Sequence, residues 1–143
     1  MQITSRFTLA IHAILFIRCY EESHKVTSAE LARSIGADAT IIRRVLGQLQ
    51  SAGIVAVRPG VGGASIARPL VEVNLFDIYE AIEASSGPLF KFYQTKDPTC
   101  SVASNIHIAI DESLTRIEDA MIDEMRAVNM ESLYKKIAPL FTA

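Results

Sequence analysis

Arginine and hydroxyl side chains gather in two short segments of the first half of the chain. Thr40, Arg43 and Arg44 lie in segment 39–52, and Arg58 directly precedes a glycine-rich run. An arginine can donate paired hydrogen bonds to a guanine base edge or bind a phosphate as a cation. The same arginines would be ordinary on the solvated face of a helix, so their meaning depends on the elements that carry them.

Further candidate contacts with DNA occur at expected helix N-termini and in the glycine-rich run. Hydroxyls and N–H groups at a helix N-terminus attract phosphates, although simple helix capping explains Ser5 and Ser28 nearly as well. The glycines either let backbone N–H groups approach a phosphate or only make a turn, and Arg58 is placed to enter a narrow minor groove. The full candidate set is Ser5, Arg6, Ser28, Thr40, Ile41, Arg43, Arg44, Gln48, Arg58, Gly60, Gly62, Gly63 and Ser65.

The cysteines and histidines form no recognisable site in the sequence. Cys19 and Cys100 are too few for a disulfide framework, and Cys19 is expected to be core. Cys100 is a candidate redox sensor, because an adjacent helix N-terminus would lower the pKa of its thiol, but an inert thiol is the alternative. His12, His24 and His107 lack metal-ligand spacing, and no nucleophile–base arrangement occurs. We therefore expect that the protein is not an enzyme and that it has no metal site, no cofactor and no catalytic residue.

Charge is unevenly distributed between the two halves of the chain. The net charge is −2, yet residues 1–68 hold eight Lys/Arg against four Asp/Glu, whereas residues 69–143 hold six against twelve. A basic first half and an acidic second half suit a DNA-facing end and a remote end. The sequence shows no apolar run of the roughly 20 residues needed to cross a bilayer and no export signal. A cytoplasmic location is therefore expected.

The first half is expected to form three helices. Apolar residues at helical spacing predict a helix over 4–20, and the sequence at 27–30 matches a capping box for a second, short helix. Gly36 would end that helix, and Asp38 would cap a third helix over 39–52. The residues expected to form the buried stripe of this third helix are Ile42, Val45, Leu46 and Leu49. Two helices joined by a short turn that contains glycine are typical of a helix-turn-helix.

A hairpin is expected directly after the third helix. Segments 54–58 and 64–68 are predicted to be strands, and the intervening run at 59–63, which contains proline and three glycines, is expected to be a tight, non-helical loop. A glycine-rich hairpin after a helix-turn-helix is a wing.

Helices are also expected in the second half. Asn74 opens a helix after a connector at 69–73, a long helix spans about 101–127, and Asn129 caps a short final helix. Roughly 25 residues at 1.5 Å each make a rod of about 38 Å, longer than one small domain needs. Segment 89–99 is expected to be irregular. Its aromatic side chains, which are expected to cover the core, are Phe90, Phe92 and Tyr93.

The long helix carries an apolar stripe suited to a partner helix. Ile108 and Ile122 belong to a second apolar face, which predicts burial on more than one side. The residues expected at a dimer interface are Ile106, Ile110, Leu114, Ile117, Met121 and Met125. The pattern predicts a mostly α fold with a small β-wing. A winged helix-turn-helix over 1–70 is expected to pack as one unit with a helical connector and dimerisation region over 71–143.

These features resemble the Rrf-two (Rrf2) family of bacterial winged-helix transcription regulators. The resemblance covers nearly the whole chain and rests on the opening helix, the sequence QLQSAGIV at 48–55, the wing sequence RPGVGG at 58–63, and Cys100 ahead of a long helix. It implies a homodimer whose long helices cross at the interface and which recognises a palindromic operator in double-stranded DNA.

Two departures from the family pattern bear on function. Cluster-binding members place three cysteines before and at the start of the long helix, whereas here only Cys100 matches the first and 101–107 supplies no other. An iron–sulfur cluster needs about four ligands, mostly thiolates, so the resemblance implies a member without a cluster. Ala64 and Ser65 stand where the family has an aromatic residue after the paired wing glycines. Whether this position contacts a base or a phosphate therefore stays an open question.

The leading hypothesis is a DNA-binding repressor tuned by an unidentified signal. That signal is a small molecule, a thiol modification or a partner protein, and a ligand pocket between the wing domain and Phe90, Phe92 and Tyr93 is one interpretation. A winged helix used only for protein interaction is the alternative, which Arg43, Arg44 and Arg58 disfavour. A small catalytic domain is disfavoured because the sequence offers no arrangement of a nucleophile and a base.

Overall fold

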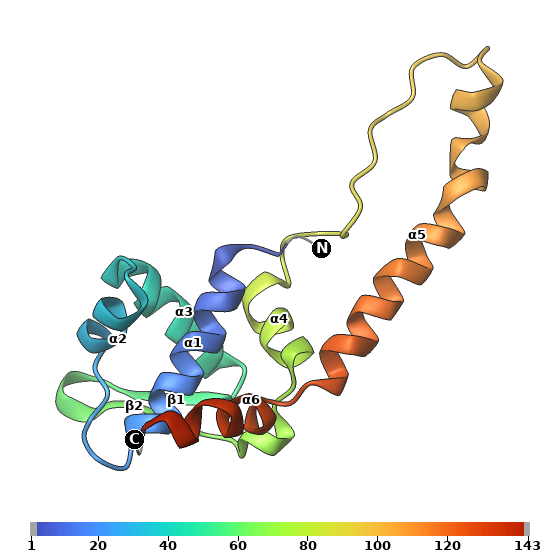
Figure 1. The fold of residues 1–143 in the computed structure, drawn as a ribbon. Helices are drawn as coiled ribbons and strands as arrows, with labels where there is room; N and C mark the ends of the chain where they lie inside the picture. Colours follow the sequence, from blue (N-terminus) through green and yellow to red (C-terminus); the bar gives the residue numbers. More distant parts are fainter. Residues whose placement is uncertain (1–2, 142–143) are drawn as a thin grey trace.

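The computed structural model describes residues 3–141, with α-helices forming most of the chain (Figure 1). The first five elements make the helix-turn-helix and the wing, as predicted, and three helices follow. In chain order they are α1 (Ser5–Tyr20), α2 (Ser28–Ile35), α3 (Ala39–Ser51), β1 (Val55–Arg58), β2 (Gly63–Ile66), α4 (Leu75–Glu83), α5 (Ser101–Ala127) and α6 (Met130–Ile137).

Side-chain caps set the beginnings of these helices. The hydroxyl of Thr27 accepts a hydrogen bond from the Glu30 N–H at 3.1 Å while the Glu30 carboxylate accepts one from the Thr27 N–H, which confirms the predicted capping box of α2. Asp38 caps α3 and Asn129 caps α6, also as predicted. Gly36 ends α2 in the left-handed conformation, with φ of 77°.

The wing is a two-stranded antiparallel sheet. It is fixed to the rest of the molecule through Val26, the residue that precedes the cap of α2. Val55 pairs with Ile66 and Arg58 pairs with Gly63. The Ala64 N–H donates to the Val26 carbonyl at 2.8 Å. The loop differs from the prediction, since Gly60–Gly62 form one short 3₁₀ turn. Glycine tolerates the positive φ of 75° at Gly60, which lets the chain turn within three residues.

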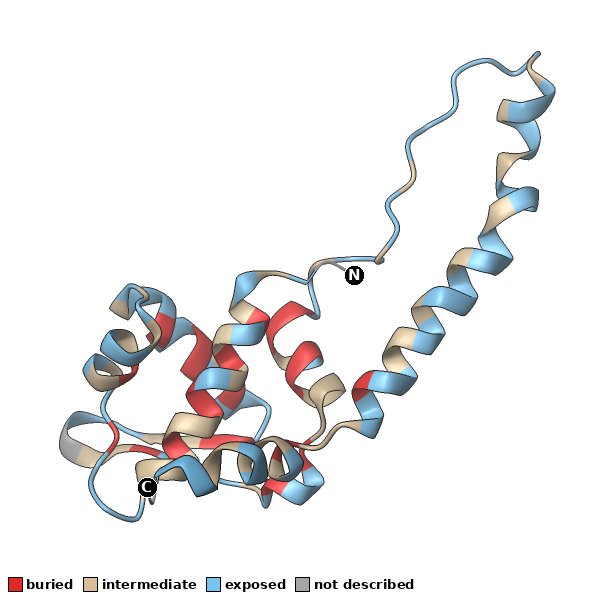
Figure 2. Cartoon of the chain, viewed as in Figure 1, coloured by how far each residue is buried: buried red, intermediate tan, exposed pale blue. Residues whose placement is uncertain are grey.

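A single apolar core joins the helix-turn-helix to the later helices (Figure 2). The expected stripe of α3 is buried, and so are side chains of α4 and α6 that lie far along the sequence. The largest fully buried side chains include Ile14, Ile17, Leu31, Ile42, Leu49, Ile54, Ile78 and Met130. The core therefore positions α3 and the wing against a support that comes from both halves of the chain.

One buried carboxylate links the start of α1 to the end of α4. Glu83 is 1% exposed, and its Oε1 accepts hydrogen bonds from both the N–H and the hydroxyl of Thr4. Within the described residues, its other oxygen has no hydrogen-bond partner. The start of α1 is therefore held against α4, far along the sequence.

The long helix α5 extends away from the core, and an extended segment rises beside it to its N-terminus (Figure 1). The prediction that the aromatic residues of segment 89–99 cover the core was wrong, since Phe90 is 36% and Tyr93 70% exposed. Phe92 instead packs on His107 of α5, with ring centroids 4.1 Å apart. Segment 89–99 leads to the N-terminus of α5, away from the wing (Figure 1), so within one subunit these aromatics do not lie against the wing domain. Across residues 3–141, no helix combines the length and apolar character needed to span a membrane.

The apolar residues of α5 divide into two groups along the helix. Met125 is buried in the core of its own subunit, so its place in the expected dimer interface is corrected. Met121 and Ile122 pack against the same core. Ile117 is 52% and Ile108 82% exposed, so neither apolar face is covered within the subunit beyond the last turns.

Candidate nucleic-acid interface

A groove of about 360 Å³ separates α3, the second helix of the helix-turn-helix, from the wing. It is lined by Ser28 at the start of α2, by Arg43 of α3, and by Arg58, Gly60 and Gly63 of the wing. These five residues were predicted as DNA contacts from three separate segments. The fold brings them to one site because β2 pairs with the residue that precedes the cap of α2.

Two arginines that line this groove, and Arg44 beside them on α3, are free to bind an anion. Arg43, Arg44 and Arg58 are all exposed. Within residues 3–141, no carboxylate lies within ion-pair distance of any of the three, whereas Arg68 is paired with Asp77 at 3.2 Å. Their positive charge is therefore directed to solvent and is available to a phosphate or a base edge.

The first turn of α3 is capped by Asp38 and faces solvent. Asp38 accepts a hydrogen bond from the Thr40 N–H at 2.7 Å, and this bond lowers the pKa of the Asp38 carboxyl, with a smaller contribution from the charge of Arg43. Thr40 is exposed, and Ile41 is 41% exposed. The buried stripe of α3 holds the opposite face against the core, so this turn projects outward.

The far end of α3 differs from the prediction. Gln48 is only partly exposed and does not line the groove; its Oε1 is buried and has no hydrogen-bond partner within the described residues. Gln50 and Gly47 line the groove instead. They follow Arg43 by seven and four residues, a spacing that places all three on one helix face. That spacing was the signal in the sequence that would have identified Gln50.

Two wing glycines are required by close packing. A Cβ added at Gly62 would overlap the Cβ of Arg58, and one added at Gly63 would lie 2.9 Å from the Val26 carbonyl oxygen. Gly63 also has a φ of 71°. These contacts fix the stem of Arg58 and the approach of the wing to α2, which accounts for the glycines through structure alone.

Gly63→Ala should therefore lower the free energy of unfolding by about 1–3 kcal/mol, because the substitution adds both backbone strain and a clash with backbone. Gly47→Ala is the matched control. Its Cβ meets nothing within 4 Å in the middle of α3, so it should raise the free energy of unfolding by about 0.5–1 kcal/mol. Urea unfolding at fixed protein concentration, followed by circular dichroism, measures both. Equal stability of the Gly63 variant and the parent chain would contradict this role of the glycine.

Three other predicted DNA contacts lie away from the groove. Ser5 is exposed at the first residue of α1, and Arg6 is partly exposed with its Nε 3.5 Å from the Thr4 hydroxyl. This end of α1 is the one that Glu83 of α4 holds. Ser65 is exposed on β2. Contacts of these three residues with DNA stay predictions.

The cysteines lie on different parts of the molecule. Cys100 is partly exposed at the N-cap of α5, where its side chain makes no capping hydrogen bond. Close by, the Thr99 hydroxyl donates to Asp97 at 2.6 Å and lowers the pKa of that carboxyl. Burial raises the pKa of the Cys19 thiol on α1. Over residues 3–141, no three His, Cys, Asp or Glu side chains are grouped so as to hold a metal ion.

Comparison with known proteins finds similarity to transcriptional regulators, both in a family model and in an individual protein. The family model described as "Rrf2: Iron-dependent Transcriptional regulator" matches residues 3–136. The chain is 29% identical over 131 residues to the "Putative HTH-type transcriptional regulator YwnA" of Bacillus subtilis (strain 168), with 92% of this chain and 96% of that protein covered.

Solved structures share the fold over nearly the full length. A crystal structure described as "a putative DNA binding protein" matches with a TM-score of 0.69 and 28% identity, covering 90% of this chain and 97% of the other. CymR, the global cysteine regulator of B. subtilis, matches with a TM-score of 0.69 and 16% identity, covering 94% and 97%. At that identity, the CymR match is evidence of fold alone.

Proposed function

Because this chain belongs to the Rrf2 family of transcriptional regulators, we propose that it binds a palindromic operator as a homodimer and represses transcription there. The observation that carries the proposal is the groove between α3 and the wing, where Arg43 and Arg58 converge without a carboxylate partner within the described residues. Double-stranded DNA is the partner whose chemistry suits two exposed cations on either side of a groove. We also place this regulator in the cytoplasm.

Each part of the groove has a role in binding. The first turns of α3 enter the major groove, where Thr40, Arg43 and Arg44 meet base edges and phosphates. The wing follows the backbone of the same DNA, with Arg58 directed to the minor groove. Ser28 donates to a phosphate from the N-terminus of α2. Gln50, which lies about one turn beyond Gly47, extends the contact along the major groove.

The homodimer forms through α5. Ile106, Ile110, Leu114 and Ile117 lie along one side of the helix, and none of them belongs to the subunit core. Ile117 is exposed and the other three are partly exposed, and a continuous apolar stripe that reaches solvent over several turns is expected to be covered in an assembly. Two copies that pair through this stripe would present two winged helices, as a two-fold symmetric operator requires.

The regulator works without an iron–sulfur cluster, although the family model is described as iron-dependent. Each chain offers Cys100 at the start of α5 and Cys19 on α1. One cysteine near the start of the long helix does not supply the roughly four ligands that a cluster needs. The signal that changes operator binding is therefore of another kind, either a small molecule, a partner protein or a modification of Cys100.

Selection from a random pool of DNA duplexes tests the proposed function. Reduced, full-length protein should enrich one sequence over successive rounds, and the enriched sequence should be an inverted repeat. Its half-sites should be centred about one helical turn apart, or a multiple of that distance. Enrichment of no common sequence, with binding that depends only on salt, would instead support a winged helix that serves a protein partner.

A further inference from the structure

A second cavity, of about 390 Å³, lies along α1 and is open to solvent. It is bounded by α1, by Ser34 of α2, by Ile137 at the end of α6 and by the C-terminal 3₁₀ turn Ala138–Phe141. None of its lining residues also lines the groove between α3 and the wing. Its volume falls in the range of pockets that hold small molecules.

The body of this cavity is apolar and rich in aromatic rings. Phe16 and Tyr20 of α1 lie with ring centroids 4.7 Å apart, and Phe141 meets Tyr20 edge-on at 5.7 Å. Ile11 and Leu15 complete this wall. Edge-to-face and offset contacts of this kind favour an aromatic guest over an aliphatic one of equal size. The cavity is therefore suited to an aromatic guest.

The polar side chains gather on the walls formed by α1 and α2. His12 Nε2 lies 3.0 Å from the Ser34 hydroxyl, which joins α1 to α2. Both groups line the open edge of the cavity, where both residues are exposed, and both can donate or accept a hydrogen bond. Among the described lining residues there is no Asp, Glu, Lys or Arg, and burial raises the pKa of the Cys19 thiol, which favours its neutral form. This chemistry favours an uncharged guest with one hydroxyl group.

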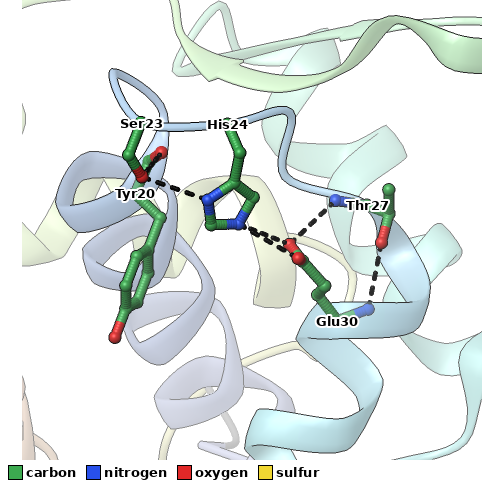
Figure 3. A network of polar contacts seen from close by, with 5 residues as sticks. All are labelled: Tyr20, Ser23, His24, Thr27 and Glu30. Carbon is green, nitrogen blue, oxygen red and sulfur yellow. Dashed lines mark hydrogen bonds and ion pairs between the residues drawn. The ribbon is translucent and has the colours of Figure 1, made fainter.

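A chain of contacts runs from this cavity to the groove between α3 and the wing, and Figure 3 shows the residues that form it. The centroid of the Tyr20 ring, which lines the cavity, lies 5.7 Å from the centroid of the His24 ring. His24 Nε2 lies 3.0 Å from the Glu30 carboxylate. Glu30 forms the capping box with Thr27, and Thr27 lines the groove between α3 and the wing. A guest that moves Tyr20 would thus act on the first turn of α2.

We propose that this cavity is an effector site for a small, uncharged phenol-like molecule, and that occupancy changes operator affinity through Tyr20, His24 and the capping box of α2. The change in operator affinity rests on the proposed function, whereas binding of the small molecule to the cavity does not. The effector acts only through its different affinity for two arrangements of Tyr20 and α2, and such coupling commonly changes affinity by about 5-fold to 150-fold.

Binding is tested with 4-fluorophenol, followed by fluorine NMR on the reduced, full-length protein. It should bind with a Kd on the order of 1 mM or tighter, given its few non-hydrogen atoms. The isosteric 4-fluorotoluene lacks the hydroxyl and should bind at least about 5-fold more weakly, because it cannot make the hydrogen bond. Because His12 and Ser34 both line the cavity, the double variant His12→Phe with Ser34→Ala should remove that preference. No binding of 4-fluorophenol, or a preference that the double variant leaves unchanged, overturns the site.

Coupling is tested with His24→Phe, which keeps a ring beside Tyr20 and removes the contact with Glu30. In the parent chain, 4-fluorophenol should change the exchange rates of the α2 first-turn amide hydrogens and shift operator affinity by about 5-fold or more. In His24→Phe, binding should persist while both effects disappear. Amide exchange needs no DNA, so it separates failure of this inference from failure of the proposed function. Binding that leaves these amides unchanged in the parent chain would overturn the coupling.

Discussion

Replacing Arg43 and Arg58 together with alanine should lower operator affinity by roughly 30-fold to 10⁴-fold. Each arginine is exposed at the groove and has no ion-pair partner within residues 3–141. Removing one such arginine costs about 1–3 kcal/mol of binding free energy, and each factor of ten corresponds to about 1.4 kcal/mol. The slope of log affinity against log salt should also fall by about one unit for each phosphate that is no longer neutralised. Fluorescence anisotropy over a range of salt concentrations measures both quantities.

The control removes the same charge from another face. Lys135 and Lys136 are on α6, outside the groove, and both are exposed. Lys135→Ala with Lys136→Ala should leave operator affinity within about 3-fold of the parent value, since it alters only the distant field of the protein. Equal decreases in affinity for the two double variants would mean that net charge, rather than this groove, governs binding.

Introducing Ile110→Asp with Leu114→Asp should raise the dissociation constant of the dimer by at least about 10³-fold. Both side chains lie on the stripe of α5 that does not belong to the subunit core. Burying an unpaired carboxylate in an interface costs about 3–5 kcal/mol, whereas neither substitution disturbs the core. Sedimentation velocity at low micromolar concentration should therefore show a monomer whose circular dichroism is close to that of the parent chain. Operator binding should fall in parallel.

Asn105→Asp with Arg116→Gln changes the charge of the same helix by the same two units away from both the stripe and the face of Ile108 and Ile122, where both residues are exposed. This variant should remain a dimer. A parent chain that sediments as a monomer, or two double variants that dissociate alike, would contradict the assignment of the interface to the stripe.

The sequence was most informative where structure is decided locally. Thr27, Asp38, Asn74 and Asn129 each cap the helix that they were predicted to begin, because a cap depends on hydrogen bonds within three residues. Periodicity also identified the buried face of α3 correctly. These local signals place the helix-turn-helix and the wing, and with them most of the groove.

Features that depend on distant partners were predicted less well. Phe90 and Tyr93 are aromatic but lie in a segment without periodicity, so no pattern indicated the direction of their side chains, and both are exposed. Met125 continues the α5 stripe without a break, yet the chain packs the last turns of α5 against its own core. Glu83 resembles an ordinary surface carboxylate of a helix in the sequence. Its burial follows from the distant Thr4 that donates to it.

Hydroxyl-radical footprinting of the selected operator is the most direct test of the central claim, that two copies of this chain each bring α3 and the wing to one half-site. We expect two protected tracts on each strand, related by the dyad of the operator and spaced by whole helical turns. The variant without Arg43 and Arg58 should show neither tract. A single unpaired tract, or protection without a fixed position along the duplex, would contradict binding by a symmetric pair of winged helices.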